Sequence, residues 1–206
     1  MAILAHDRAM IPAVVLAAGK STRMGRTKAL LPLGGETFVS RIVATFRSAG
    51  VEDVVVVVGH DAERVAEALG RLDAPPRVIV NPNYETGQLS SILAGLRAID
   101  RPGVTAMLMT LVDVPLVSAN TVRAVLDCYR STSAPVVRPV SGDRHGHPVL
   151  LDRTLFSLIR GADPAAGAKP IVRAHTSARG DVEVFDEGAF TDIDTPDEYT
   201  AVTERF

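Results

Sequence analysis

The sequence predicts a three-layer α/β domain with a mostly parallel sheet and helices on both of its faces. Short, largely β-branched apolar runs recur along the chain, which is typical of strands buried on both faces. Amphipathic segments with apolar residues at i, i+3, i+4 and i+7 alternate with these runs. Of the 206 residues, 47% are hydrophobic and 22% charged, so the chain can bury a sizeable core and is not disordered.

The first part of the chain carries the clearest elements. Continuous apolar runs predict strands at residues 14–16, 54–58, 78–80 and 107–112. Apolar residues at helical spacing predict helices around 39–46 and 122–129. Gly50 follows the first of these helices, Ser118 can cap the second, and Asp61 can cap a further helix between them.

From residue 134 onward the pattern loosens into shorter elements. Strands are expected at 136–137, 148–151 and 182–185, between turns rich in glycine and proline. The closing helix has the strongest start signal, because Thr195-Pro196-Asp197-Glu198 offers an N-cap, a proline at the first helical position and two acidic residues. We interpret residues 1–10 as an N-terminal extension and residues 11–206 as a single domain.

Composition and charge exclude several classes of protein. The 22 basic and 24 acidic residues give a net charge of −2, which predicts no general affinity for nucleic acid or an acidic membrane. The apolar runs fall short of the roughly 18 residues that span a membrane. Cys128, the single cysteine, can form no internal disulfide, which suits a reducing compartment. We therefore expect a cytoplasmic protein with neither a nucleic-acid nor a membrane partner.

The most informative stretch, Leu16-Ala17-Ala18-Gly19-Lys20-Ser21-Thr22-Arg23-Met24-Gly25, follows the first strand. It is not a P-loop, which would need a glycine where Val14 stands, and it lacks the three closely spaced glycines of a dinucleotide fingerprint. Small residues let the backbone approach a ligand, while Arg23 and the nearby Lys28 supply positive charge. A triphosphate fits this combination. The alternative, that these basic residues only solvate a surface loop, stays open.

This stretch resembles the signature of nucleotidyltransferases with a Rossmann-like nucleotide-diphospho-sugar transferase fold. These enzymes transfer a nucleoside monophosphate from a nucleoside triphosphate to a phosphorylated acceptor. The order and spacing of further segments are similar to the molybdenum cofactor cytidylyltransferase group, over about residues 11 to 206: Asn81-Pro82-Asn83-Tyr84, Gly87, Ser90-Ser91-Ile92, Gly95-Leu96, Val112-Asp113-Val114-Pro115, Gly146-His147-Pro148-Val149-Leu150 and Asp192-Ile193-Asp194-Thr195-Pro196. This chain has Val112 where most relatives have glycine before the aspartate.

The resemblance implies a Mg²⁺-dependent transfer of CMP from CTP to the phosphate of molybdopterin, with release of pyrophosphate. A molybdoenzyme of the xanthine dehydrogenase type would be a partner. The first half of the domain would bind the nucleotide and the second half the acceptor. Ala18 favours a pyrimidine, because guanylyl-transferring relatives resemble Leu-Ala-Gly-Gly here. Alternatives are a transferase that uses a sugar or polyol phosphate and a non-catalytic nucleotide- or cofactor-binding chaperone.

Three carboxylates are candidate metal ligands. Asp113 follows a buried strand, so it should emerge at the edge where α/β sheets bind ligands, and one or two carboxylates suit Mg²⁺. Asp192 and Asp194 are expected to alternate along a short strand, so that only one faces the metal, and Asp194 could instead cap the last helix. With Asp113, we expect Arg23 and Lys28 to be catalytic by neutralising the phosphates.

The resemblance also suggests residues that contact the two substrates. The acceptor would lie against Gly146, His147 and Pro148, although loop histidines could equally be solvated. Plain structural roles remain for Asn81 as a turn residue and Ser90 as an N-cap. We expect the nucleotide to be held by Leu16, Ala17, Ala18, Gly19, Arg23, Lys28, Gly59, Asn81, Ser90 and Ser91.

Overall fold

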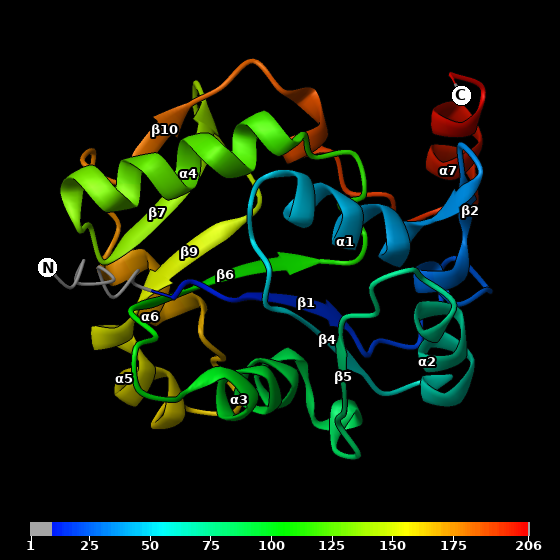
Figure 1. Cartoon of the computed structure of the whole chain (residues 1–206), viewed down its shortest axis with the longest axis horizontal. Helices are drawn as coiled ribbons and strands as arrows, with labels where there is room; N and C mark the ends of the chain where they lie inside the picture. The colour runs from blue at the N-terminus through cyan, green and yellow to red at the C-terminus, as the bar shows by residue number, and fades with distance from the viewer. Residues whose placement is uncertain (1–9, 206) are drawn as a thin grey trace, which may run out of the picture.

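The computed structural model describes residues 10–205. Its central feature is a twisted sheet that runs through the molecule (Figure 1). Most of the predicted extension, residues 1–9, lies outside the described part of the chain. Within the described part, the sheet has eight strands: β1 (Ala13–Ala17), β4 (Val54–Val58), β5 (Arg77–Val80), β6 (Ala106–Leu111), β7 (Val136–Ser141), β8 (Arg144–His145), β9 (Val149–Asp152) and β10 (Asp181–Glu183).

The strands are ordered β10-β7-β9-β6-β1-β4-β5, with β8 paired to β7. Strands β6, β1, β4 and β5 are parallel to one another, and β10 is parallel to β7. Strand β9 runs antiparallel to both β6 and β7. The predicted three-layer α/β fold with a mostly parallel sheet is therefore confirmed. The antiparallel pairings of β8 and β9 lie in the half where the sequence pattern loosens.

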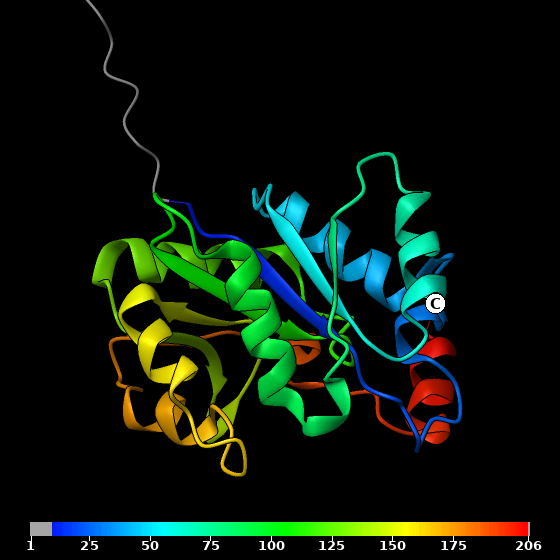
Figure 2. The same cartoon turned by 90° about the horizontal axis from the view of Figure 1, so that it is seen from below.

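Helices cover both faces of the sheet (Figures 1 and 2). Along β1, Ala13, Val15 and Ala17 face a cluster that includes α1 and α4, whereas Val14 and Leu16 face a cluster that includes α3 and α5. Both faces are buried, which is why the strands are continuous apolar runs. The helices are α1 (Phe38–Ser48), α2 (Ala62–Gly70), α3 (Gln88–Ile99), α4 (Ala119–Thr132), α5 (Phe156–Arg160), α6 (Lys169–Ala174) and α7 (Pro196–Thr203).

Most of the predicted helix caps are present. The Ser118 hydroxyl accepts a hydrogen bond from the Thr121 N–H, and Thr195 forms a capping box with Glu198 at the start of α7. The expectation that Asp61 caps α2 is wrong, because its side chain makes no capping hydrogen bond there. Its backbone is left-handed, and its carboxylate accepts hydrogen bonds from the Thr27 hydroxyl and from Arg64 instead. Asp61 thus holds the first loop against the start of α2.

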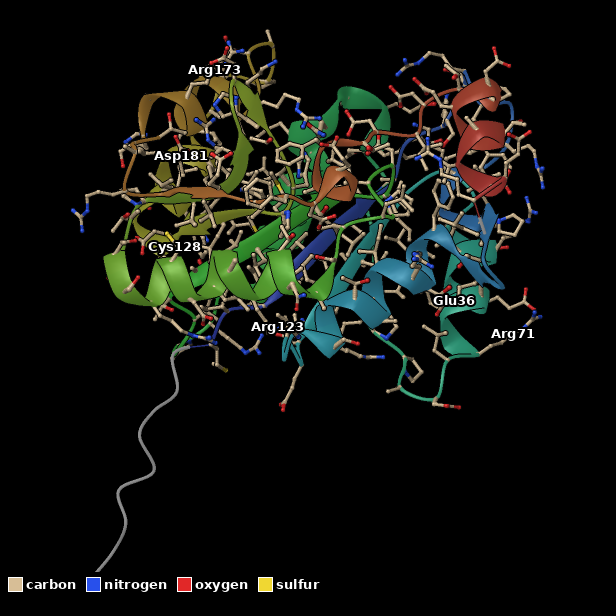
Figure 3. All side chains as sticks on the ribbon, turned by 90° about the horizontal axis from the view of Figure 1, so that it is seen from above. Glu36, Arg71, Arg123, Cys128, Arg173 and Asp181 are labelled. Carbon is tan, nitrogen blue, oxygen red and sulfur yellow. The ribbon has the colours of Figure 1, made fainter. Side chains whose placement is uncertain are left out.

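The last helix lies beside the hairpin of β2 (Pro32–Leu33) and β3 (Glu36–Thr37), where Glu36 is labelled in Figure 3. The Tyr199 hydroxyl donates to the Pro32 carbonyl at 2.7 Å, and Val202 shares a buried apolar cluster with Leu33. This contact brings the segment before α7 back to the first loop. Elsewhere, Cys128 is partly buried on α4, with its Sγ 3.4 Å from the Arg179 carbonyl (Figure 3).

The short 3-10 helices are η1 (Lys28–Leu30), η2 (Tyr84–Thr86), η3 (Arg153–Leu155) and η4 (Glu187–Phe190). The first two border the site described below. In the part of the chain from 10 to 205, no helix is long and apolar enough to cross a membrane.

Close packing of α3 on the sheet predicts a cost for a single methyl group. A Cβ at Gly95 would lie 2.5 Å from Cγ1 of Val14, a fully buried strand residue. We expect Gly95→Ala to lower the free energy of unfolding by about 1–3 kcal/mol through overpacking, despite the better helix propensity of alanine. Urea denaturation measures it. Gly70→Ala, at a helix position with open space around it, is the control and should range from neutral to about 1 kcal/mol stabilising. A neutral Gly95→Ala would contradict this packing.

Candidate active site

A cavity of about 340 Å³ opens beyond the carboxyl ends of β1 and β6. Ligands of open α/β sheets bind at this edge. The first loop forms one wall, the connection between β5 and α3 forms another, and the segment before α7 adds Asp194. The lining residues are Leu16, Ala17, Ala18, Gly19, Ser21, Thr22, Arg23, Thr27, Lys28, Ala29, Tyr84, Gly87, Gln88, Ser91, Leu111, Val112, Asp113 and Asp194. This set contains nine of the residues predicted from the sequence, namely Leu16, Ala17, Ala18, Gly19, Arg23, Lys28, Ser91, Asp113 and Asp194.

Opposite charges meet at one side of this cavity. The buried Lys28 ammonium bonds to Asp194 Oδ1 and lies 3.5 Å from Asp113 Oδ2. Arg23 donates to Asp194 Oδ2 at 2.7 Å. The hydrogen bond from Lys28 is the main reason that the pKa of Asp194 is lowered. Both predicted phosphate-binding cations thus contact a predicted metal-binding carboxylate.

The first loop places the Lys28 side chain through local hydrogen bonds. The Lys28 backbone N–H donates to Ser21 Oγ at 3.2 Å, and the adjacent Thr27 hydroxyl donates to Asp61. The short helix η1 then begins at Lys28. The backbone on both sides of Lys28 is therefore held in place, and the Lys28 ammonium points to the carboxylates of Asp113 and Asp194.

Asp113 leaves β6 at the cavity edge, as predicted, and one of its carboxylate oxygens is free. Its Oδ1 is buried and has no hydrogen-bond partner among residues 10–205. Its carbonyl accepts a hydrogen bond from the Ile193 N–H at 2.8 Å, which holds the segment before α7 in place. A buried carboxylate oxygen without a partner suits a cation, because such a group is costly to leave unpaired.

Residues 191–194 do not form the expected short strand. Asp194 lines the cavity, and Thr195, not Asp194, caps α7. Asp192 is outside the cavity lining, and its pKa is raised by burial and, next, by the charge of Asp113. In the described part of the chain, no three His, Cys, Asp or Glu side chains are grouped to hold a metal alone. Mg²⁺ commonly takes one or two carboxylates and completes its shell with phosphate and water.

The three predicted acceptor residues lie outside the cavity lining. His147 is largely buried, and burial lowers its pKa; its ring hydrogen bonds to the backbone of Met109, and Nδ1 has no partner in the described chain. A Cβ at Gly146 would collide with the carbonyl of Ala189. Gly146-His147-Pro148 therefore packs between β6 and η4, and its contact with an acceptor stays a prediction.

Of the three nucleotide-binding residues predicted after β5, Ser91 reaches the cavity, whereas Asn81 and Ser90 lie behind it and support it. Asn81 is buried, and its Nδ2 donates to Ser90 Oγ at 2.9 Å and to Ser91 Oγ at 3.0 Å. The Ser90 hydroxyl points to backbone carbonyls, and Gly87, not Ser90, is the N-cap of α3. Ser91 lines the cavity, and its own hydroxyl hydrogen has no acceptor among residues 10–205.

The cavity is also lined by residues that the sequence did not single out as site residues, namely Tyr84 from the connection between β5 and α3, Gln88 at the start of α3, and Ser21, Thr22, Thr27 and Gly87. Gly59 is outside the lining, and a Cβ there would lie 2.6 Å from the Tyr84 ring. Its role in this structure is to make room for that ring. Tyr84 and Gly87 belong to the segments that carry the family resemblance, and this membership is the feature of the sequence that could have indicated their place in the site.

A small-residue loop, two cationic side chains and two carboxylates surround one cavity, a combination that suits phosphate groups and a divalent ion. The chain belongs to the family of MobA-like NTP transferase domains, whose model matches residues 13–179. The family is one of nucleotidyltransferases. Matching structural neighbours place the fold among the nucleotide-diphospho-sugar transferases.

Two curated relatives match almost the whole chain. The nicotine blue oxidoreductase of Paenarthrobacter nicotinovorans is 33% identical, over 92% of this chain and 94% of the relative. The purine catabolism protein PucB of Bacillus subtilis is 31% identical over the same shares. The crystal structure of Rv0371c from Mycobacterium tuberculosis is 29% identical with a TM-score of 0.79, covering 95% of this chain and 98% of that one. A manganese complex of Rv0371c is 28% identical with a TM-score of 0.76, covering 96% and 100%.

The ion pairs of Asp194 predict an acid-sensitive contribution to stability. Because its pKa is lowered in the folded state, the pairing stabilises the protein above the unfolded pKa of about 3.9 and is lost as pH falls through the folded value. We expect Asp194→Asn to cost about 1–3 kcal/mol near pH 7 and progressively less below pH ~4. Urea midpoints from pH 3 to 7 measure it.

The control is Asp143→Asn in an exposed turn, where no ion-pair partner is found in the described chain; its effect should stay within about 0.5 kcal/mol. If the difference in the free energy of unfolding between wild type and Asp194→Asn does not decrease at acidic pH, that result would contradict the pairing.

Proposed function

We propose that the protein is a Mg²⁺-dependent cytidylyltransferase that transfers CMP from CTP to the phosphate of molybdopterin and releases pyrophosphate. The observation that carries this proposal is the meeting of Lys28, Arg23, Asp113 and Asp194 at the end of a small-residue loop. Family membership supports nucleotidyl transfer. The cytosine base and the molybdopterin acceptor rest on the sequence resemblance, and a molybdoenzyme of the xanthine dehydrogenase type would receive the product.

The chemistry is mainly one of positioning and charge neutralisation. An oxygen of the acceptor phosphate attacks the α-phosphorus of CTP, and the bond from that phosphorus to the bridging oxygen of pyrophosphate breaks. The acceptor phosphate is already ionised, so no general base is needed. Lys28 and Arg23 would bind phosphate oxygens and neutralise the charge that moves onto pyrophosphate.

Asp113 is suited to hold the divalent ion, because its buried Oδ1 has no partner in the described chain. Asp194 or Asp192 would supply a second carboxylate. When bound, the ion would add positive charge beside the α-phosphate and the leaving group. The manganese complex of Rv0371c supports a divalent ion in a protein of this fold.

Ser91 supports a preference for cytosine. Because Ser91 Oγ accepts from Asn81, its hydroxyl hydrogen can be donated to a base in the cavity. N3 of cytosine is an acceptor, whereas N3 of uracil carries a hydrogen. A donor held in place therefore favours cytosine over uracil at this position.

The test measures pyrophosphate release with CTP, GTP, ATP and UTP, each paired with molybdopterin or a sugar phosphate. Release with CTP and molybdopterin supports the proposal. Release only with a sugar phosphate, or nucleotide binding without release, would replace it with one of the alternatives.

Loss of the Asp113 carboxylate should abolish most of this activity. We expect Asp113→Asn to lower kcat by about 10²–10³ with the fold intact, because electrostatic stabilisation of the phosphates is weakened. Pyrophosphate release measures kcat, and circular dichroism shows whether the variant is folded. Asp127→Asn, on the exposed side of α4, is the matched control. Full turnover by Asp113→Asn would exclude Asp113 as a metal ligand.

The Ser91 hydroxyl should affect base selection more than folding. We expect Ser91→Ala to lower kcat/KM for CTP by about 5–50-fold, as for one lost hydrogen bond, and to narrow the ratio of CTP to UTP use. The control is Ser131→Ala on the exposed face of α4, because the Ser131 hydroxyl donates to the Cys128 carbonyl and contacts no other polar partner among residues 10–205. An unchanged CTP to UTP ratio would contradict this role.

A further inference from the structure

The Lys28 ammonium lies between the two carboxylates that line the cavity. It contacts Asp194 Oδ1 and lies 3.5 Å from Asp113 Oδ2. Arg23 takes the other oxygen of Asp194. Of the two carboxylates that line the cavity, only Asp113 Oδ1 is left without a cationic or hydrogen-bonding partner among residues 10–205.

A divalent ion and this ammonium compete for the same oxygens. Mg²⁺ holds its oxygen ligands at about 2.1 Å and demands near-octahedral geometry, so it cannot share both carboxylates with a cation wedged between them. The ammonium is nearly buried, its side chain being 9% exposed, so water screens the repulsion between the two cations poorly. Metal binding to both carboxylates therefore requires the ammonium to leave.

A nucleotide supplies the reason for it to leave. A triphosphate in the cavity offers Lys28 and Arg23 several charged oxygens, which are strong acceptors for both side chains. The backbone of Lys28 stays anchored through Ser21, so only its flexible side chain has to move. The Arg23 side chain is largely exposed, with 69% of it accessible, so neighbouring side chains leave it room to turn from Asp194 toward a phosphate.

We propose that Lys28 is an internal counter-cation that keeps Asp113 and Asp194 from binding a divalent ion until the nucleotide arrives. In the free protein the ammonium neutralises the carboxylates. When the triphosphate binds, its oxygens take over Lys28 and Arg23, and the released carboxylates of Asp113 and Asp194 would then be available to hold the ion. This role rests on the proposed function of the same site, and it gives the site an order of binding in which metal follows or accompanies nucleotide.

The test is a titration of the metal-free, full-length protein with Mn²⁺, with free Mn²⁺ followed by electron paramagnetic resonance and no nucleotide present. We expect Lys28→Met to bind Mn²⁺ at least tenfold more tightly than wild type. Lys28→Arg, which keeps the charge, should stay as weak as wild type. Lys28→Met with Asp113→Asn should lose the gain, because the negative charge of Asp113 and one of its two oxygens are then absent.

Lys20→Met is the matched control, because Lys20 lies on the same loop but pairs with Glu85. It should leave Mn²⁺ affinity unchanged. If Lys28→Met does not fold, Lys28→Gln, which keeps a donor for Asp194, takes its place, and a larger rise in Tm with Mn²⁺ than wild type shows is the second readout.

Equal Mn²⁺ affinity of wild type and the Lys28 variant, without nucleotide, would overturn the proposal. Because the Mn²⁺ titration involves no turnover, that result would not bear on the proposed transferase activity, which the pyrophosphate assay tests. Conversely, tighter Mn²⁺ binding by Lys28→Met would stand even if CTP and molybdopterin proved to be the wrong substrates. The two failures are therefore distinguishable.

Discussion

The site depends on one charge balance, in which Lys28 and Arg23 neutralise carboxylates that come from distant parts of the chain. Lys28 belongs to the loop after the first strand, Asp113 to the end of β6 and Asp194 to the segment before α7. Each group would be costly to hold near the interior alone, because a buried charge needs a partner. Their mutual neutralisation allows a polar cavity to persist at the edge of an apolar sheet.

The fold supplies the constraint that brings these groups together. Parallel pairing of β1 with β6 places the first loop and Asp113 at the same edge. The return of the chain to the hairpin of β2 and β3 adds Asp194, and the hydrogen bond from Ile193 to Asp113 fixes that segment. The buried apolar cluster under α7 thus supports the site although it contacts no ligand.

The sequence predicts the layers well, because strands buried on both faces are continuous valine and leucine runs such as 54–58. It also predicts that Lys28 and Asp113 lie at the carboxyl edge of the sheet, because the segments that directly follow parallel strands meet there. It does not predict that Asp194 pairs with Lys28, because that contact joins residues far apart in the chain. Nor does it show that Asn81 and His147 are buried, since their polarity suggests exposure, or that Gly59 makes room for Tyr84.

A crystal structure of the protein with a non-hydrolysable CTP analogue and Mn²⁺ would show directly whether Lys28 passes from the carboxylates to the phosphates. We expect the triphosphate in the cavity beside the first loop, Lys28 Nζ within about 3 Å of a phosphate oxygen and the ion bound to Asp113. A nucleotide bound elsewhere, with Lys28 still paired to Asp194, would contradict this expectation.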